Sequence, residues 1–189
     1  MSEESFEEYG PLANLVGTWE SKEGLDISPG PDRSLRKTPF RERLVLEPMG
    51  AVDNHEQSLR ALRYRTMAWR LEADEDNPFH EEHGYWLWDN SGCQVIRAFL
   101  VPRGVTTMAG GTAKPDAKSF ELVAELGSDT YGICSNPFLN EQFRTVRYEL
   151  KVRVLDDSRF EYEEDTQLLL ASHDDVFHHI DQNTLTRID

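Results

Sequence analysis

Two neighbouring runs of the chain decide its fold: residues 146–154, VRYELKVRV, and residues 160–170, FEYEEDTQLLL. In the first run, apolar or aromatic side chains alternate with charged ones, and the second run keeps this spacing from Phe160 to Leu170. A period of two is typical of a strand with one buried and one solvent-exposed face. Because the turn-forming sequence DDS at 156–158 joins the two runs, they predict an antiparallel hairpin.

Outward from this hairpin, the chain reads as further short strands separated by turn-forming residues. The expected strands are Leu15–Glu20, Phe40–Leu46, Leu59–Leu71, Gly84–Trp88, Gln94–Val101, Val105–Ala109, Phe120–Leu126 and Val176–Arg187. Residues 25–38, which hold two prolines and a glycine, are expected to form a loop. The strand that begins at Phe40 is expected to end at Pro48–Gly50, and Gly110-Gly111 reads as another turn. Residues 136–142 have mixed character and read as an irregular or helical insert.

This pattern predicts an all-β fold of about ten short antiparallel strands with no long helix between them. Such a sheet must close or split to bury its apolar face and protect its edges. We therefore expect a closed antiparallel barrel, with a two-sheet sandwich as the alternative. Residues 1–11 are expected to form an acidic N-terminal tail, and residues 12–189 a single barrel domain. Trp19, which follows Gly17 in the first strand, is expected to be buried near the closed end of the barrel.

The composition argues against two classes of partner. Asp and Glu number 35 against 20 Lys and Arg, which gives a formal net charge of −15. Nucleic acids and anionic membranes bind cationic surfaces, so neither is an expected partner. The chain shows no signal peptide and no apolar run long enough to cross a bilayer, so a cytoplasmic location is expected. Its two cysteines, Cys93 and Cys134, lack CxxC spacing and are expected to be reduced, buried structural thiols.

No sequence motif of a catalytic site is present: the chain has no P-loop, GxGxxG, GxSxG or HExxH pattern. In the segment around His80 and His83, these two residues could bind a metal ion together with Glu82. Residues three apart on a strand point to opposite faces, however, so histidines on opposite faces with ion contacts at the surface are the favoured interpretation. Whether the protein is an enzyme stays open on these residues.

The adjacent pair His178 and His179 is the strongest candidate for chemistry. A neutral imidazole is the commonest metal ligand in proteins and can hold a haem iron. Strict alternation places His179 on one face of its strand with Asp181, Asn183 and Leu185. Two polar residues this close to the end of the chain are also ordinary exposed side chains, so spacing alone leaves both interpretations open.

Four stretches give the chain a family resemblance: Pro11-Leu12 to Trp19, Pro39-Phe40-Arg41-Glu42 to Gly50, His80-Glu81-Glu82-His83-Gly84-Tyr85, and His179-Ile180. Together they resemble the nitrobindin-like haem-binding β-barrels, which are related in shape to the fatty-acid-binding proteins and other calycins. The third stretch fits the family pattern H-x-E-x-G-Y, and the fourth is similar to the family's His-Leu. The family's GxWxGxG signature is matched only at Gly17 and Trp19, because Ser21 and Glu23 replace its later glycines.

The resemblance implies a cavity that holds haem b, with His179 as the iron ligand and His178 as the alternative. It also implies nitric oxide binding and the isomerisation of peroxynitrite to nitrate. A second hypothesis is a non-enzymatic carrier of a small hydrophobic or amphipathic ligand, since barrels of this size hold one such molecule. Interior cations would suit a ligand carboxylate, and Arg63, Arg65 and Arg97 are the candidates within expected strands. Nothing in the sequence indicates an oligomeric state.

Overall fold

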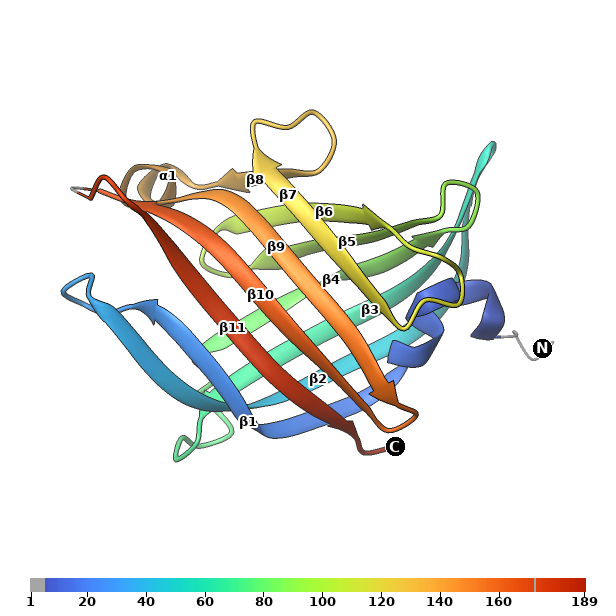
Figure 1. Ribbon diagram of the computed structural model, residues 1–189, viewed down its shortest axis with the longest axis horizontal. Coiled ribbons are helices and arrows are strands. Elements are labelled where there is room, and N and C mark those ends of the chain that lie inside the picture. Colours follow the sequence, from blue (N-terminus) through green and yellow to red (C-terminus); the bar gives the residue numbers. More distant parts are fainter. Residues whose placement is uncertain (1–5, 172) are drawn as a thin grey trace.

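The computed structural model describes residues 6–171 and 173–189, and they form a closed barrel (Figure 1). A 3₁₀ helix, η1 (Phe6–Leu15), precedes the barrel, and a short α-helix, α1 (Pro137–Gln142), interrupts it. The described residues contain eleven strands: β1 (Gly17–Pro29), β2 (Leu35–Asn54), β3 (Gln57–Arg70), β4 (His80–Asp89), β5 (Gln94–Val101), β6 (Val105–Thr112), β7 (Ser119–Leu126), β8 (Gly132–Ser135), β9 (Phe143–Asp156), β10 (Arg159–Leu170) and β11 (Val176–Arg187).

The strands follow one another around the barrel in the order β1-β11-β10-β9-β7-β8-β6-β5-β4-β3-β2, and β1 pairs with β2 to close it. The all-β barrel and the β9–β10 hairpin are therefore confirmed. The expected count of about ten strands missed β8, because four residues are too few to show a period of two. β8 also makes the barrel mixed, since it runs parallel to β7 while every other pairing is antiparallel.

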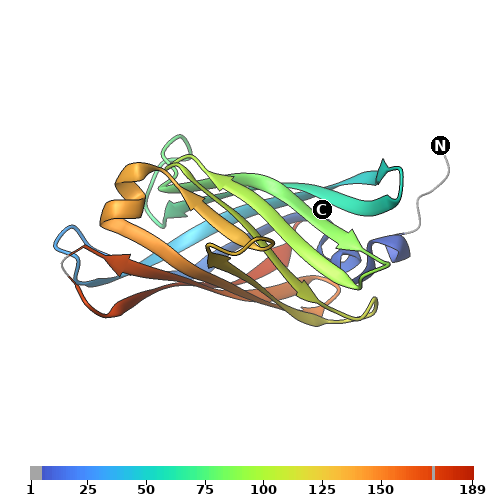
Figure 2. The ribbon, with the colours of Figure 1, turned by 90° about the horizontal axis from the view of Figure 1, so that it is seen from above.

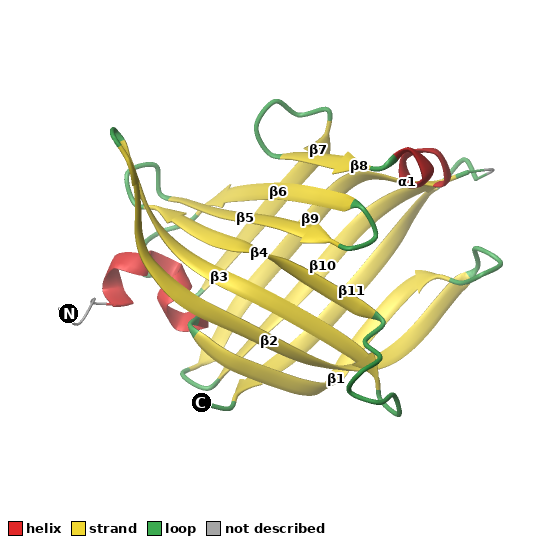
Figure 3. Cartoon of the chain, turned by 180° about the vertical axis from the view of Figure 1, so that it is seen from behind, coloured by secondary structure: helices red, strands yellow, loops and turns green. Residues whose placement is uncertain are grey.

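The two helices lie at opposite ends of the barrel (Figures 2 and 3). From η1, Tyr9, Leu12 and Leu15 are fully or almost fully buried in the core and close one end. α1 lies at the other end, where Asn136 caps it by accepting a hydrogen bond from the Leu139 amide. No described helix has the length and apolar character needed to cross a membrane. Residues 1–5 of the expected tail lie outside the described residues, and the division at residue 12 stays a prediction.

Trp19 is buried at the end that η1 closes, as expected. Its ring packs edge-on against Phe160, with ring centroids 4.7 Å apart, and its indole N–H donates to the Leu15 carbonyl at 2.8 Å. The guanidinium of Arg187 covers the indole at 4.3 Å from the ring centroid. Trp19 thus fastens η1 to the barrel through one buried hydrogen bond and a large apolar contact.

Replacing Trp19 with phenylalanine should destabilise the fold by about 1–3 kcal/mol, because it leaves the buried Leu15 carbonyl without its donor. Urea unfolding followed by circular dichroism measures this change. A variant with the wild-type midpoint would show that the indole N–H does not stabilise the closed end.

One expected loop and one expected strand end are wrong. Residues 25–29 and 35–38 belong to β1 and β2, so the connecting loop covers only residues 30–34. In residues 25–29 and 35–38, the side chains that point into the barrel, such as Asp26, are polar. This concealed the alternation of buried and exposed residues that marks a strand. β2 continues past Pro48–Gly50, where a register shift absorbs the irregular residues.

The expected turn at Gly110-Gly111 is also wrong, since both glycines lie within β6. They are required by close packing: a Cβ on Gly111 would lie 1.9 Å from the Glu121 carbonyl oxygen, and one on Gly110 would collide with the Tyr131 ring. The cysteines correct a further expectation, because Cys93 and Cys134 are both free but exposed.

Candidate functional site

The inside of the barrel contains a cavity of about 760 Å³, within the usual range for a site that binds one small molecule. It reaches from Leu15 at the closed end to the loop around Pro31 and to Leu139 of α1 at the other end. Much of its wall is apolar and includes Trp86 on β4. The apolar side chains that line it include Phe40, Leu44, Leu46, Ala68, Trp86, Phe99, Leu150, Val152, Phe160 and Leu168.

The two candidate histidines lie on opposite sides of the barrel wall. His179 lines the cavity, whereas the side chain of His178 is 56% exposed and pairs with Asp165 at 2.7 Å on the outside. The alternation of β11 explains this difference, and it places Asp181, Asn183 and Leu185 inside together with His179, as predicted.

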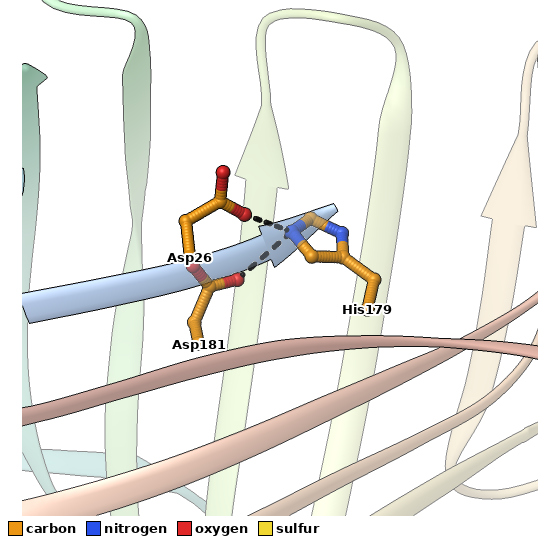
Figure 4. Close-up of side chains that lie close together, drawn as sticks. All are labelled: Asp26, His179 and Asp181. Atoms are coloured by element: carbon orange, nitrogen blue, oxygen red, sulfur yellow. Dashed lines mark hydrogen bonds and ion pairs between the residues drawn. The ribbon is translucent and has the colours of Figure 1, made fainter. Parts of the chain in front are cut away.

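His179 is held between two carboxylates (Figure 4). Its Nε2 atom lies 2.8 Å from Oδ1 of Asp26 on β1 and 3.2 Å from Oδ2 of Asp181 on β11. Asp26 is directly opposite Asp181 in the register of the two strands. Since like charges in such a pair repel, the imidazole between them relieves an unfavourable contact.

These contacts control the charge of His179. Burial opposes protonation, but the hydrogen bonds and charges of Asp181 and Asp26 outweigh it and raise the pKa of His179 to about 10. The protonated ring stabilises the folded state fully below the ordinary pKa of 6.5, and this stabilisation is lost as the pH rises through about 10.

We therefore expect the wild-type protein to lose stability between pH 6.5 and pH 10 relative to the His179→Gln variant. Urea midpoints of both proteins across this range measure the difference. A difference that stays constant with pH would contradict the assignment of a protonated imidazole between the two carboxylates.

The segment with His80 and His83 does not bring its histidines together. His80 and Glu82 line the cavity, with His80 Nε2 3.6 Å from the carboxylate. His83 pairs with Glu81 at 2.9 Å, and both are among the partly or largely exposed side chains of β4. The favoured interpretation is confirmed for the opposite faces of the two histidines and for the surface pair His83–Glu81, but it is wrong for His80–Glu82, which lies inside the barrel rather than at the surface.

Of the three candidate interior arginines, only Arg97 is inside. It forms ion pairs with Glu82 and Glu164 and hydrogen bonds with the hydroxyl groups of Tyr64 and Tyr148. Burial acts to raise the pKa of Glu82, but the charge of Arg97, together with His80 and the Tyr64 hydrogen bond, outweighs it and lowers that pKa to about 2. Arg97 is therefore already neutralised by the protein itself.

Arg63 and Arg65 correct the other two expectations, because they face outward and pair with Glu47 and Glu81. The cations that the sequence did not single out are Arg36, Arg70 and Arg103. Each lines the cavity near its open end, and none of the three forms an ion pair with another described residue.

Glu42 is a further buried group that sequence reasoning missed. Its carboxylate accepts hydrogen bonds from Thr66, Tyr162 and Asn183, each at 2.7 Å. Burial is the main cause that raises the pKa of Glu42 above its usual value. The sequence could have revealed this group, because Glu42 lies on the same face of β2 as the apolar residues Phe40 and Leu44.

Although Ser21 and Glu23 replace the later glycines of the family's signature, Gly24 on β1 still packs closely against a neighbouring strand. A register shift between Ser21 and Gly24 brings Gly24 opposite Phe40, and a Cβ on Gly24 would lie 2.5 Å from that ring. The absence of glycine at Ser21 and Glu23 therefore leaves the packing of β1 on Phe40 intact.

Comparison with known proteins agrees with this architecture. The crystal structure of Rv2717c from M. tuberculosis aligns with a TM-score of 0.63 and 19% identity, over 94% of this chain and 95% of that chain. At this identity the likeness shows the fold alone. No curated protein matches the chain significantly. The model of the THAP4-like, haem-binding β-barrel domain matches residues 8–187, and the chain therefore belongs to that family.

Proposed function

We propose that this protein binds haem b in the barrel cavity, with His179 as the axial ligand of the iron. The observation that carries the proposal is the position of His179, whose imidazole lines the cavity from the last strand while His178 lies outside. Membership of a haem-binding family supports it. Haem supplies a Lewis-acidic iron that binds nitric oxide and peroxynitrite, and the protein's part is axial ligation and confinement.

Four features of the cavity fit haem. Its volume of about 760 Å³ suits one cofactor-sized molecule, and much of its wall is apolar. Arg36, Arg70 and Arg103 near the open end offer positive charge to the two propionates. His179 offers an imidazole, although its Nε2 atom is shared by Asp26 and Asp181. His179 can bind the iron once the two carboxylates no longer bond to Nε2.

The finer activity we propose is nitric oxide binding and isomerisation of peroxynitrite to nitrate. The apolar wall and the closed end would keep bulk water away from the reacting molecule, and products would leave through the open end. The chain's own residues would hold the group in place and exclude competing ligands. Assigning this activity requires rates of nitrate formation from peroxynitrite with the wild-type protein and with His179→Gln.

An absorbance titration with hemin tests the binding proposal. We expect a Soret band that grows to a limit at one equivalent of hemin, because the cavity lined by His179 would hold one haem. Absorbance that rises in proportion to added hemin without reaching a limit would overturn the proposal.

A carrier of an amphipathic carboxylate is the second candidate function, and the same three arginines favour it. Arg97, by contrast, cannot bind a ligand carboxylate, because Glu82 and Glu164 already pair with it. Displacement of a fluorescent fatty acid by unlabelled fatty acid tests this function. It is supported if displacement occurs in a protein that gives no saturable Soret band with hemin.

A further inference from the structure

We propose that Asp26, His179 and Asp181 form a binding site for one divalent transition-metal ion in the haem-free protein. The three residues offer one imidazole nitrogen and two carboxylate oxygens, and these ligand atoms all lie within 4.8 Å of one another. They come from two adjacent strands, so the barrel itself holds them together.

The distances between the ligand atoms suit a metal ion. Nε2 of His179 lies 2.8 Å from the Asp26 oxygen and 3.2 Å from the Asp181 oxygen. Nitrogen and oxygen ligands bind ions such as Zn²⁺ at about 2.0–2.2 Å, which places neighbouring ligands about 3 Å apart. An ion could therefore sit between the three atoms with only small movements of their side chains.

The charge and position of the carboxylates support the same conclusion. Asp26 and Asp181 are directly opposed in the strand register, and their side chains are only 7% and 24% exposed. A divalent ion would neutralise both charges at once, with the imidazole in its neutral form. Ser28 donates to the other oxygen of Asp26 at 2.8 Å, as a residue that orients a metal ligand does.

The donor set indicates which ions would bind. One imidazole with two carboxylates suits Zn²⁺, Mn²⁺, Fe²⁺ and Co²⁺ better than the soft ions that thiolates select. Because Asp26, His179 and Asp181 all line the cavity, the remaining coordination positions would face it and take water or a small ligand. The same nitrogen cannot hold this ion and a haem iron, so the two would exclude each other.

Calorimetric titration of the haem-free protein with Zn²⁺ tests the proposal. We expect one site, weakened more than about 100-fold in Asp26→Asn and Asp181→Asn and about 10–100-fold in Ser28→Ala, which removes an orienting partner only. The matched control is Asp165→Asn, which removes the carboxylate of the outer pair with His178 and should leave Zn²⁺ affinity unchanged.

Absence of a saturable heat in the wild-type protein would overturn the proposal, and so would unchanged affinity in both Asp26→Asn and Asp181→Asn. Circular dichroism of each variant shows whether the barrel is folded before titration. Hemin binding distinguishes the metal-site proposal from the haem proposal, since these Asp variants retain His179 and should still give a Soret band. Loss of Zn²⁺ binding in these folded variants supports the metal site whether or not the wild type binds hemin, and where it does, retention of the Soret band shows that His179 is still in place.

Discussion

Replacing His179 with glutamine should weaken hemin binding by more than about 100-fold, beyond the 10–100-fold cost of losing a residue that only orients a ligand. Glutamine cannot serve as a strong axial ligand, but its amide N–H groups can still donate to Asp26 and Asp181, which hold this position in the wild-type protein. The barrel should therefore stay folded while the saturable Soret band is lost. Hemin titration followed by absorbance measures the change, and circular dichroism confirms the fold.

His178→Gln is the matched control, because His178 is the neighbouring histidine but pairs with Asp165 outside the barrel. It should bind hemin as the wild-type protein does. If His178→Gln loses the Soret band and His179→Gln keeps it, the assignment of the ligand is reversed.

The variant Asp26→Asn should have the opposite effect on hemin binding. It should strengthen hemin binding, since each unit by which it lowers the pKa of His179 makes the neutral ring about tenfold more abundant at neutral pH.

Replacing Arg97 with methionine should destabilise the barrel by about 3–5 kcal/mol, the usual cost of removing one partner of a buried ion pair. Glu82 and Glu164 would then be left inside the barrel without their cation. The Tyr64 and Tyr148 hydroxyls would still donate to them, at 2.8 and 2.7 Å, but cannot replace the lost charge. Urea unfolding at neutral pH measures the difference in free energy of unfolding.

Arg65→Met is the control for this experiment. Arg65 pairs with Glu81 at 2.8 Å on the outside of β3, where its side chain is 49% exposed. Exposed ion pairs of this kind contribute about 0–1 kcal/mol, so this variant should unfold near the wild-type midpoint. Equal effects of the two substitutions would show that the group around Arg97 does not stabilise the fold.

The fold could be predicted where one face of a strand is apolar. β9 follows its expected run closely, because large apolar side chains recur at every second position from Val146 to Val154. β10 and β5 were also predicted, although Glu164, Thr166 and Arg97 interrupt their inward apolar series. The interior of this barrel is partly polar, however, and the prediction was wrong there. In the second half of β1, Leu25 and Ile27 alternate with Asp26 and Ser28, but the polar pair faces the cavity, and the following Pro29-Gly30-Pro31 made this stretch read as a loop.

The candidate site was predictable to the same limited extent. Alternation places His179 with Asp181, since both lie in one strand. It cannot reveal Asp26, because that contact depends on the register between β1 and β11, which are 153 residues apart at this point of the chain. The grouping of Arg97 with Glu82 and Glu164 has the same origin, since three different strands contribute one residue each.

The position of the iron in crystals grown with hemin tests the central claim most directly. Anomalous scattering at the iron absorption edge locates the metal independently of the rest of the structure. The account predicts one peak in the barrel cavity within bonding distance of Nε2 of His179, with Asp26 and Asp181 turned away from that atom. A peak beside His80, which also lines the cavity, or a peak outside the barrel would contradict it.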